Sequence, residues 1–460
     1  MKMKTTDVLK RALAAFVTAS LVGSGVSIPA IAAEKEPYLN DSLTAEERAL
    51  DLVSRMTPAE KYAQLNAQTA PAIKRLGVRE YDWWSEGLHG VARDGVATSF
   101  PTGLGIAASW DPDLVKQVTS AISDEAREKF NAHGNAHGLN YWSPTINMAR
   151  DPRWGRAEET YGEDPYLTAQ IGGAFIKGFQ GDTDTYKAIA TAKHFLGNNS
   201  EQNRHNGSSN IDERDLHEYY TRAFKDVVED YNVGAVMTSY NAVNGVPMSV
   251  NKPIVTDLLR ETWGFDGFVV TDCGALDDIV WRHQWRPENW GNKAWGGKET
   301  SAYAIKAGVD LNCGAVLREN TANAVKAELL SDDEVDRALV RLFTARMKTG
   351  EFDENGGEYG GDKFKGEIVS EEHKELAEKS SDNGVVLLKN ESDILPIKNK
   401  SNIVLVGGLA EELQLGDYST WEPHNTSTVK EGIEAALKRA DNNAELTFIK
   451  DTNLGLHQYM

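Results

Sequence analysis

A single carboxylate ends a run of strand-forming residues at positions 267–272, where the sequence reads GFVVTD. Val269, Val270 and Thr271 are β-branched residues, which favour a buried strand. At the end of that strand Asp272 either caps the next helix or takes part in chemistry. As a catalytic group it can act as a nucleophile that attacks the anomeric carbon of a sugar and forms a covalent glycosyl intermediate.

Other polar side chains are of types that can bind a sugar beside this carboxylate. Lys193 and His194 supply a cation and an imidazole, and nearby positive charge would favour the ionised form of Asp272. Arg156, in the stretch DPRWGR, can offer paired donors to hydroxyls or carboxylates. Glu86 lies among aromatic residues and glycines in WWSEGLHG, and can accept hydrogen bonds from a sugar.

Tryptophan is abundant, with 11 residues in the chain. Indole faces can stack on the apolar face of a sugar ring, whereas most buried tryptophans serve only the hydrophobic core. Trp281 and Trp285 follow the Asp272 strand closely in the sequence. They are therefore our first candidates for sugar platforms, with a core role as the alternative.

The elements that would position these residues alternate between strands and helices. Continuous apolar strands separated by helices predict a parallel sheet that is covered on both faces. In a (β/α)8 barrel the carboxyl ends of all strands open on one face, where active sites lie. The sequence therefore predicts an α/β fold with a TIM-like barrel. Strands are expected at 139–146, 188–195, 234–240, 267–272 and 308–312, with helices at 213–230 and 251–262.

The alternating pattern ends near Gly350, where an acidic, glycine-rich stretch follows. A helix predicted at 370–383 and a strand predicted at 402–408 then start a second α/β region. We therefore expect a signal peptide at 1–33, a barrel at 34–350, a linker at 351–368 and part of an α/β sandwich at 369–460.

The N-terminal residues have the pattern of an export signal. Basic residues, among them Lys10 and Arg11, precede an apolar run, and Ala30-Ile31-Ala32 is a small-x-small cleavage site. A transmembrane anchor is the alternative, but the apolar run is short and is broken by glycine and serine. We expect export to the periplasm or to the outside of a bacterial cell.

Charge and cysteine content narrow the choice of partners. The net charge of -20 argues against nucleic acid and anionic membranes, since both would repel the chain. No metal is expected, because the acidic stretch lacks the spacing of a calcium loop. No cofactor is expected either: GLGIAA at 103–108 fits a loose G-x-G-x-x-A, but no clean strand precedes it. Cys273 and Cys313 form either one bridge or two buried free thiols.

Several long motifs, in order, resemble glycoside hydrolase family 3. They are RDPRWGR (150–156), KHF (193–195), SYNAVNGVP (239–247) and VVTDCGA (269–275), and the resemblance runs from about Leu43 to about Lys450. It implies a (β/α)8 barrel followed by an α/β sandwich, and exo-acting hydrolysis of β-linked sugars with retention of configuration. By this resemblance Asp272 is the nucleophile, and the sugar-binding residues are Glu86, Arg156, Lys193, His194, Arg204 and Tyr240.

The sequence also departs from that family pattern. The loop FLGNNSEQNRHNG (195–207) lacks the histidine–aspartate pair of the branch that cleaves N-acetylglucosamine, so that activity is not expected. In the other branches the general acid is a glutamate past the midpoint of the second domain, and we do not find it in this chain. Glu422 is a conceivable replacement. We therefore expect the front portion of a longer protein, with a non-catalytic carbohydrate-binding protein as the alternative.

The nature of the sugar is predicted from Glu86 and from three further motifs. Family glucosidases usually have aspartate in the context of Glu86, and the extra methylene of glutamate would intrude where a hexose carries its C6 hydroxymethyl group. YWSP, TDCGA and VDLNCG also resemble the β-xylosidase and arabinofuranosidase branch. We therefore expect a β-xylosidase acting on β-linked plant oligosaccharides, with a β-glucosidase as the alternative.

Overall fold

The computed structural model describes residues 35–133 and 137–450, so the predicted signal peptide at 1–33 lies outside the described residues. The chain divides into Met1–Glu36 and Pro37–Met460, and the elements below belong to the second unit. No helix in the described ranges is long and apolar enough to cross a membrane. The predicted domain boundaries near 350 and 368 stay predictions.

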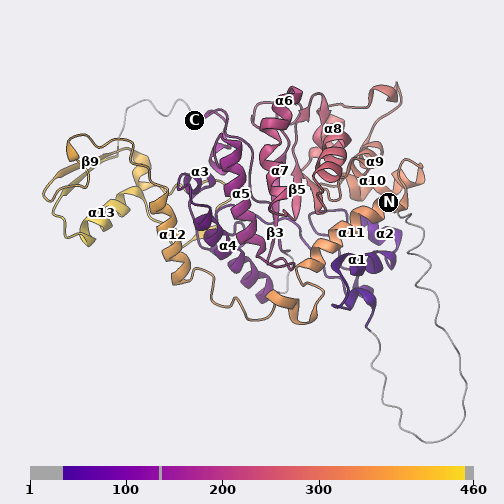
Figure 1. The fold of residues 1–460 in the computed structure, drawn as a ribbon, viewed down its shortest axis with the longest axis horizontal. Coiled ribbons are helices and arrows are strands. Elements are labelled where there is room, and N and C mark those ends of the chain that lie inside the picture. Colours follow the sequence, from indigo (N-terminus) through magenta and orange to yellow (C-terminus); the bar gives the residue numbers. More distant parts are fainter. Residues whose placement is uncertain (1–34, 134–136, 451–460) are drawn as a thin grey trace, which may run out of the picture. The chain divides into compact units, whose positions relative to one another are not determined.

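A curled parallel sheet lies at the centre of the larger part of this unit (Figure 1). Its four strands run in the order β2 (Asn140–Tyr141), β3 (Ile189–Phe195), β5 (Ala235–Thr238) and β8 (Phe268–Thr271), and all are buried. Parallel bridges extend the sheet from Tyr141 to Ser85 on one side and from Val270 to Leu311 on the other. Apolar strands of this kind need cover on both faces. The predicted TIM-like α/β fold is confirmed.

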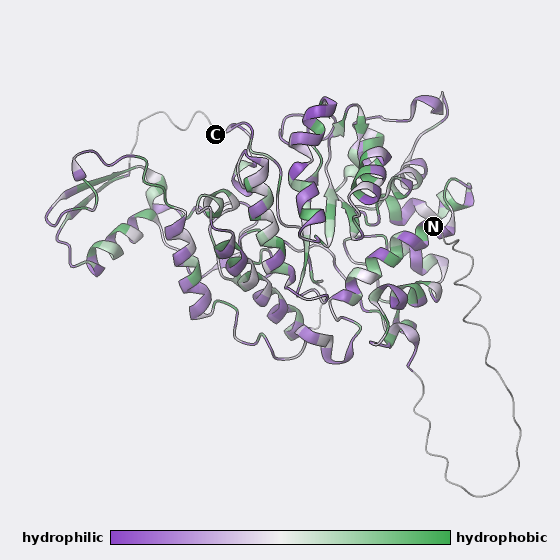
Figure 2. Cartoon of the chain, in the orientation of Figure 1, coloured by the Kyte–Doolittle hydropathy of each residue, from purple (hydrophilic) through white to green (hydrophobic). Residues whose placement is uncertain are grey.

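Helices cover the outside of the sheet. Figure 2 shows hydrophobic residues on the central strands and mixed faces on the surrounding helices, which is expected when one stripe of each helix packs inward. In α4, for example, Val115, Val118 and Ile122 recur at helical spacing and are all buried. The helices are α1 (Ala45–Ser54), α2 (Pro58–Ala63), α3 (Gly103–Ala107), α4 (Pro112–His133), α5 (Pro165–Gln180), α6 (Glu213–Asp215), α7 (Arg222–Glu229), α8 (Ala275–Trp281), α9 (Gly297–Ala307), α10 (Val316–Lys326), α11 (Asp332–Lys348), α12 (Glu371–Asn383) and α13 (Val429–Arg439).

Four predicted elements differ from those observed. The strand expected at 139–146 is observed only over Asn140–Tyr141, as β2. The expected strand at 308–312 is not a regular strand, because the successive amides of Asp310 and Leu311 both donate to the carbonyl of Val269 and so interrupt the ladder. The expected helix at 213–230 is divided into α6, a π-helical turn at Leu216–Tyr220 and α7. The expected helix at 251–262 is a π-helix over Pro253–Thr262.

The C-terminal region forms a smaller α/β arrangement. Strand β9 (Asn402–Val406) pairs in parallel with β11 (Glu445–Ile449), and α13 lies between them in the sequence. The predicted strand at 402–408 and helix at 370–383 are both confirmed as β9 and α12. A short parallel pair joins this region to the barrel. It consists of β1 (Val96–Ala97) and β10 (Glu422–Pro423). A separate small sheet is formed by β4 (Ser208–Ser209), β6 (Ala242–Val243) and β7 (Val246–Pro247).

Candidate active site

The carboxyl ends of neighbouring strands bring the predicted site residues together. Lys193 and His194 lie near the end of β3, and Tyr240 follows β5. Asp272 comes directly after β8, which pairs with β5. Because these strands are parallel, their ends meet at one edge of the sheet, as a barrel requires.

Asp272 is buried, and its two oxygens differ. Its Oδ1 accepts a hydrogen bond of 2.8 Å from the amide of Cys273. Its Oδ2 is buried and has no hydrogen-bond partner in the described part of the chain. Burial raises the pKa of Asp272, while the positive charge of Arg156 is the largest influence that favours ionisation, ahead of Lys193. The amide therefore fixes the carboxylate and leaves one oxygen available to a reacting carbon.

His194 faces this oxygen as a neutral imidazole. Its Nε2 lies 3.8 Å from Asp272 Oδ2. Burial, with the charges of Arg156, Lys193 and Arg204, lowers the pKa of His194 well below its ordinary value. The oxygen Oδ1 of Asn147 lies 3.0 Å from Nδ1, and because this oxygen can only accept, Nδ1 carries the proton. His194 thus offers Nε2 as an acceptor for a sugar hydroxyl and does not add positive charge beside Asp272.

Lys193 and Glu86 form a buried ion pair. The distance from Lys193 Nζ to Glu86 Oε2 is 3.0 Å, and the two side chains are 2% and 3% exposed. The second oxygen of Glu86 accepts a hydrogen bond of 3.2 Å from the indole of Trp84. Burial disfavours the Lys193 ammonium, but Glu86, Tyr418 and Glu159 together outweigh this and raise the pKa of Lys193. The pair therefore presents a charged donor and a fixed acceptor to a ligand.

Arg156 is held by a neighbouring carboxylate. Its Nε and one terminal nitrogen donate to the two oxygens of Glu159 at 2.5 and 2.7 Å. The same terminal nitrogen donates to the hydroxyl of Tyr418 at 3.1 Å. The paired donors predicted for Arg156 are therefore engaged by Glu159, and the guanidinium acts on Asp272 through its charge.

Tyr240 and Arg204 complete the cluster. The Tyr240 side chain lies beside Asp272 and favours the ionised carboxylate. Burial and the charge of Asp272 raise the pKa of Tyr240, so the phenol keeps its proton as a donor. The Arg204 guanidinium lies 5.1 Å from the centre of the Tyr240 ring and pairs with Glu201 at 2.8 Å.

Tyr418 belongs to the cluster but was not predicted from the sequence. Its ring lies 4.2 Å from Lys193 Nζ, and its φ of 57° is unusual for a residue other than glycine. The backbone of Asp417 is anchored on both sides, by His89 Nε2 at 2.8 Å and by Glu158 Oε1 at 2.8 Å. The aromatic stretch YSTW at 418–421 was the signal that could have indicated this residue.

Three other predicted residues lie elsewhere. Trp281 ends α8 with 74% of the residue exposed. The ring of Trp285 packs against Trp295 and Tyr303 instead. Glu422 is exposed in β10. Within the described ranges, no hydrogen bond, ion pair or ring contact joins Trp281, Trp285 or Glu422 to the Asp272 cluster. Trp84, whose indole donates to Glu86, is a tryptophan that does contact the cluster.

Cys273 and Cys313 form a disulfide bond immediately beside the nucleophile candidate. Gly274 donates its amide to the carbonyl of Cys313 at 2.8 Å, so the two segments are also joined through the backbone. Of the two readings that the sequence left open, the structure has the bridge. The bridge ties Cys273, the second residue after β8, to the segment whose Leu311 pairs with Val270.

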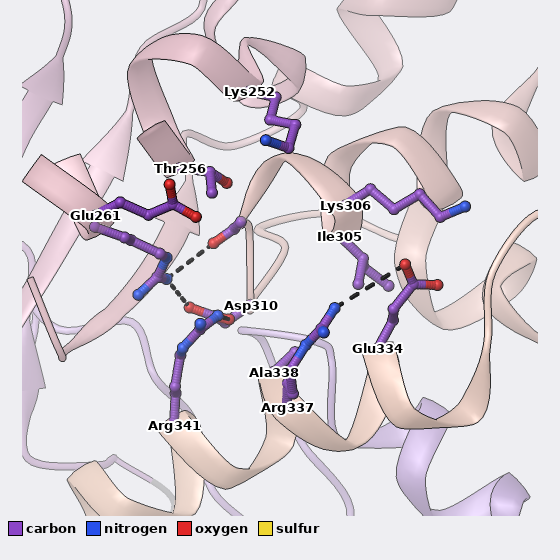
Figure 3. Close-up of a pocket in the computed structure, with 12 residues that line it drawn as sticks. Lys252, Thr256, Glu261, Ile305, Lys306, Asp310, Glu334, Arg337, Ala338 and Arg341 are labelled. Carbon is purple, nitrogen blue, oxygen red and sulfur yellow. Dashed lines mark hydrogen bonds and ion pairs between the residues drawn. The ribbon is translucent and has the colours of Figure 1, made fainter. Parts of the chain in front are cut away.

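A larger cavity, of about 520 Å³, lies at the other end of β8 (Figure 3). Several cations line it, and most of them already have carboxylate partners. Arg260 and Arg341 both bind Asp310, and Lys252 binds Asp257. This is therefore a structural ion network and not the candidate site. No group of metal-ligating side chains occurs in the described residues.

Comparisons with known proteins identify the family. The family description "Glycosyl hydrolase family 3 N terminal domain" matches residues 54–345, and "Glycosyl hydrolase family 3 C-terminal domain" matches residues 385–453. The chain is 36% identical over 442 residues to the xylan 1,4-beta-xylosidase of Xylanibacter ruminicola, covering 91% of this chain and 49% of that protein. It is 40% identical over 386 residues to a probable exo-1,4-beta-xylosidase of Aspergillus clavatus, covering 79% and 48%.

Solved structures are similar as well. A GH3 exo-beta-xylosidase in complex with a xylobiose aziridine probe aligns with a TM-score of 0.83 and 32% identity, over 92% of this chain and 55% of that one. A β-glucosidase from Erythrobacter marinus aligns with a TM-score of 0.76 and 26% identity, over 90% and 60%. The chain spans about half of the length of the curated relatives that it matches.

Proposed function

The chain belongs to glycosyl hydrolase family 3, and on that premise we propose that it is a retaining, exo-acting β-glycosidase that releases xylose from β-linked plant oligosaccharides. One observation carries the proposal: Asp272 Oδ2 is buried, unpartnered in the described part of the chain and surrounded by polar side chains of types that can bind a sugar. The N-terminal pattern at 1–33 supports export, which we propose as well.

The reaction would proceed by two displacements. Asp272 Oδ2 forms a bond to C1 of the sugar while the bond from C1 to the leaving oxygen breaks, and the electron pair of that bond leaves with the oxygen. An oxygen of water then bonds to C1 as the bond from C1 to Asp272 breaks, which restores the carboxylate. The proton that this water releases to solvent balances the proton that the leaving oxygen takes up. Lys193, Glu86 and His194 Nε2 would bind the ring hydroxyls, and the Arg156 charge and the Tyr240 hydroxyl would keep Asp272 ionised until attack.

The position of Glu86 supports a pentose. Both of its oxygens are held, by Lys193 and by Trp84, so the carboxylate cannot swing aside to admit a C6 hydroxymethyl group. The names of the relatives also favour xylosides. A β-glucosidase is the second candidate, because similar structures include enzymes named β-glucosidases.

Trapping with an activated 2-deoxy-2-fluoro-β-xyloside tests the chemistry. A dinitrophenyl leaving group needs no protonation, so the test does not depend on a general acid, which contributes about 10²–10⁴-fold in rate. Intact mass spectrometry should show one covalent adduct, and peptide mapping should place it on Asp272. The Asp272→Asn variant should stay unlabelled. Sugar binding without any adduct on folded wild-type protein would favour the non-catalytic alternative.

The choice of sugar has its own matched variant. Initial rates on dinitrophenyl β-xyloside and β-glucoside should favour the xyloside for the wild-type chain. Glu86→Asp removes one methylene and should shift this ratio toward the glucoside by about 10-fold, the value of one methylene in a pocket. A wild-type preference for the glucoside would overturn the xylosidase proposal and leave the glycosidase proposal intact.

A further inference from the structure

His205 lies behind the candidate site and has no role in the chemistry above. It follows Arg204 in the loop between β3 and β4. Its imidazole ring lies 4.4 Å from the ring of Tyr240, with 55° between the two planes. Its Nδ1 lies 2.6 Å from Oδ2 of Asp278. His205 thus connects the ring of a site tyrosine to a carboxylate on a different element.

That carboxylate belongs to the helix that follows the nucleophile. Asp278 lies in α8, which starts three residues after Asp272, and its side chain is only 8% exposed. It also pairs with Arg282 at 2.9 Å. A carboxylate this well buried must be partnered to be tolerated. Its partners therefore hold Asp278 in place, and the short backbone segment from Asp272 to Asp278 links the positions of the two carboxylates.

The two partners of His205 select one form of its ring. Asp278 accepts from Nδ1, so Nδ1 carries a proton. Arg204 Nε lies 3.4 Å from Nε2 and can only donate, so Nε2 must be the acceptor. Both contacts are satisfied together only by the neutral tautomer with its proton on Nδ1. His205 therefore orients Arg204 as well as contacting Tyr240.

Tyr240 is held on several sides. His205 packs on its ring, and the Arg204 guanidinium lies 5.1 Å from the ring centre. The backbone carbonyl of Tyr240 lies 2.9 Å from Nε2 of His283. His283 in turn donates its amide to the carbonyl of Asp278 at 2.7 Å. Contacts therefore connect Asp278 to His205, His205 to Tyr240 and Tyr240 to Asp272. The backbone from Asp272 to Asp278 joins the two ends of this series.

We propose that His205, clamped by Asp278, is a positioning residue that sets Tyr240 and Arg204 around the nucleophile Asp272. It does not touch the reacting atoms, and it acts through the tyrosine ring and the arginine. The proposal rests on the glycosidase function proposed above. Misplacing a group at a reacting centre by about 1 Å can cost 10²-fold in rate, which sets the scale of the expected effect.

Labelling kinetics with the activated 2-fluoro-xyloside test the proposal. His205→Ala should slow the saturating rate of labelling of Asp272 by about 10- to 100-fold. His205→Asn keeps a donor where Nδ1 stands and should recover part of that loss. His217→Ala, at an exposed histidine on the π-helical turn at Leu216–Tyr220, is the matched control and should label at the wild-type rate. Equal saturating rates for His205→Ala and wild type would overturn the proposal.

A second measurement separates this proposal from the glycosidase function and from a purely structural role. With 3-fluorotyrosine at position 240, the ¹⁹F resonance should shift or broaden in His205→Ala and stay unchanged in His217→Ala, whether or not wild type is labelled. Absence of labelling in wild type would reject the function, while an unchanged resonance would reject the positioning role. If His205 contributes only to stability, His205→Ala should lower the thermal midpoint but leave the labelling rate per folded molecule unchanged. That result would also reject the positioning role. If His205→Ala does not fold, Asp278→Asn removes the clamp charge and should move the same resonance.

Discussion

The two ends of strand β8 use the same kinds of side chain in opposite ways. At the base, Asp310 is buried between Arg260 and Arg341, and both of its oxygens have partners. At the carboxyl end, Asp272 is also buried beside Arg156, yet its Oδ2 has no partner in the described ranges. A buried carboxylate with all its partners supports the fold. One that lacks a partner costs stability and is therefore the better candidate for chemistry.

The same comparison applies to how each end is joined to the next segment. At the base, Asp310 accepts from the amide of Val269 at 2.8 Å, so an ion network connects the segments. At the carboxyl end a disulfide and a backbone bond connect Cys273, Gly274 and Cys313. The covalent link holds the site without occupying the polar groups that a substrate needs.

Substitution of the two aspartates should give the largest contrast in stability. Asp310→Asn leaves the buried Arg260 and the partly buried Arg341 without their counter-charge and should lower the free energy of unfolding by about 3–5 kcal/mol. Asp272→Asn should leave it unchanged or raise it at pH 7. Folding raises the pKa of Asp272, so the free energy of unfolding of the wild type decreases as pH rises from the ordinary carboxyl pKa through the pKa in the folded state. The variant has no ionisable group at this position and does not undergo this decrease. Urea unfolding at pH 7 measures both.

The labelling assay gives the reverse contrast. Asp310→Asn should label at the wild-type rate for each folded molecule, while Asp272→Asn should not label. A loss of stability in Asp272→Asn as large as that in Asp310→Asn would contradict the distinction between the two ends. Arg337→Gln, at an exposed residue near the same base cavity, controls for a change of charge there.

Removing the disulfide should have the next largest effect. The bridged residues are 40 positions apart, and closing a loop of that size contributes about 2–4 kcal/mol through the unfolded chain. The double variant Cys273→Ser with Cys313→Ser should lose this amount in urea unfolding. It should also label more slowly, by several-fold, because the Cys273 amide holds Asp272 Oδ1. An unchanged labelling rate would show that the backbone alone positions the nucleophile.

The strand ends could be predicted from the sequence because periodicity and residue type are local. GFVVTD indicates a buried strand that ends in a carboxylate. Lys193 and His194 are likewise polar residues near the end of an apolar strand. Tyr418 could not be found in this way, because its contact with Lys193 joins residues more than 200 positions apart. Trp281 was chosen for its closeness in sequence to Asp272, but α8 carries it away to an exposed position.

The strand expected at 308–312 shows a second limit. Its composition suits a strand, but Asp310 turns toward Arg260 and Arg341, and two amides share one carbonyl. Tertiary ion pairing outweighs a local preference that is worth at most about 1 kcal/mol. Glu159, which fixes Arg156, was also missed, because nothing in its local sequence distinguishes it from its neighbour Glu158.

The smallest expected effect concerns a further charged cluster, in which His373 contacts Glu125 and Glu367. His373 in α12 has Nδ1 3.0 Å from Glu125 and Nε2 3.3 Å from Glu367, so both ring nitrogens face carboxylates. Burial disfavours the imidazolium, but these partners outweigh it and raise the pKa of His373. Because both ring nitrogens of His373 have partners, His373 should resemble Asp310 and affect only the stability of the fold.

The raised pKa of His373 determines how its contribution to the free energy of unfolding depends on pH. The stabilisation is fully present below the ordinary histidine pKa of about 6.5 and is lost as pH rises through the higher folded value. The wild type should therefore exceed His373→Gln in free energy of unfolding by more at pH 6 than at pH 9, while His217→Gln should show no such change. Labelling of Asp272 in His373→Gln should equal that of wild type for each folded molecule. A difference that grows toward pH 9 would mean that His373 is buried neutral, and that even a pair with both nitrogens facing carboxylates can carry an uncompensated cost.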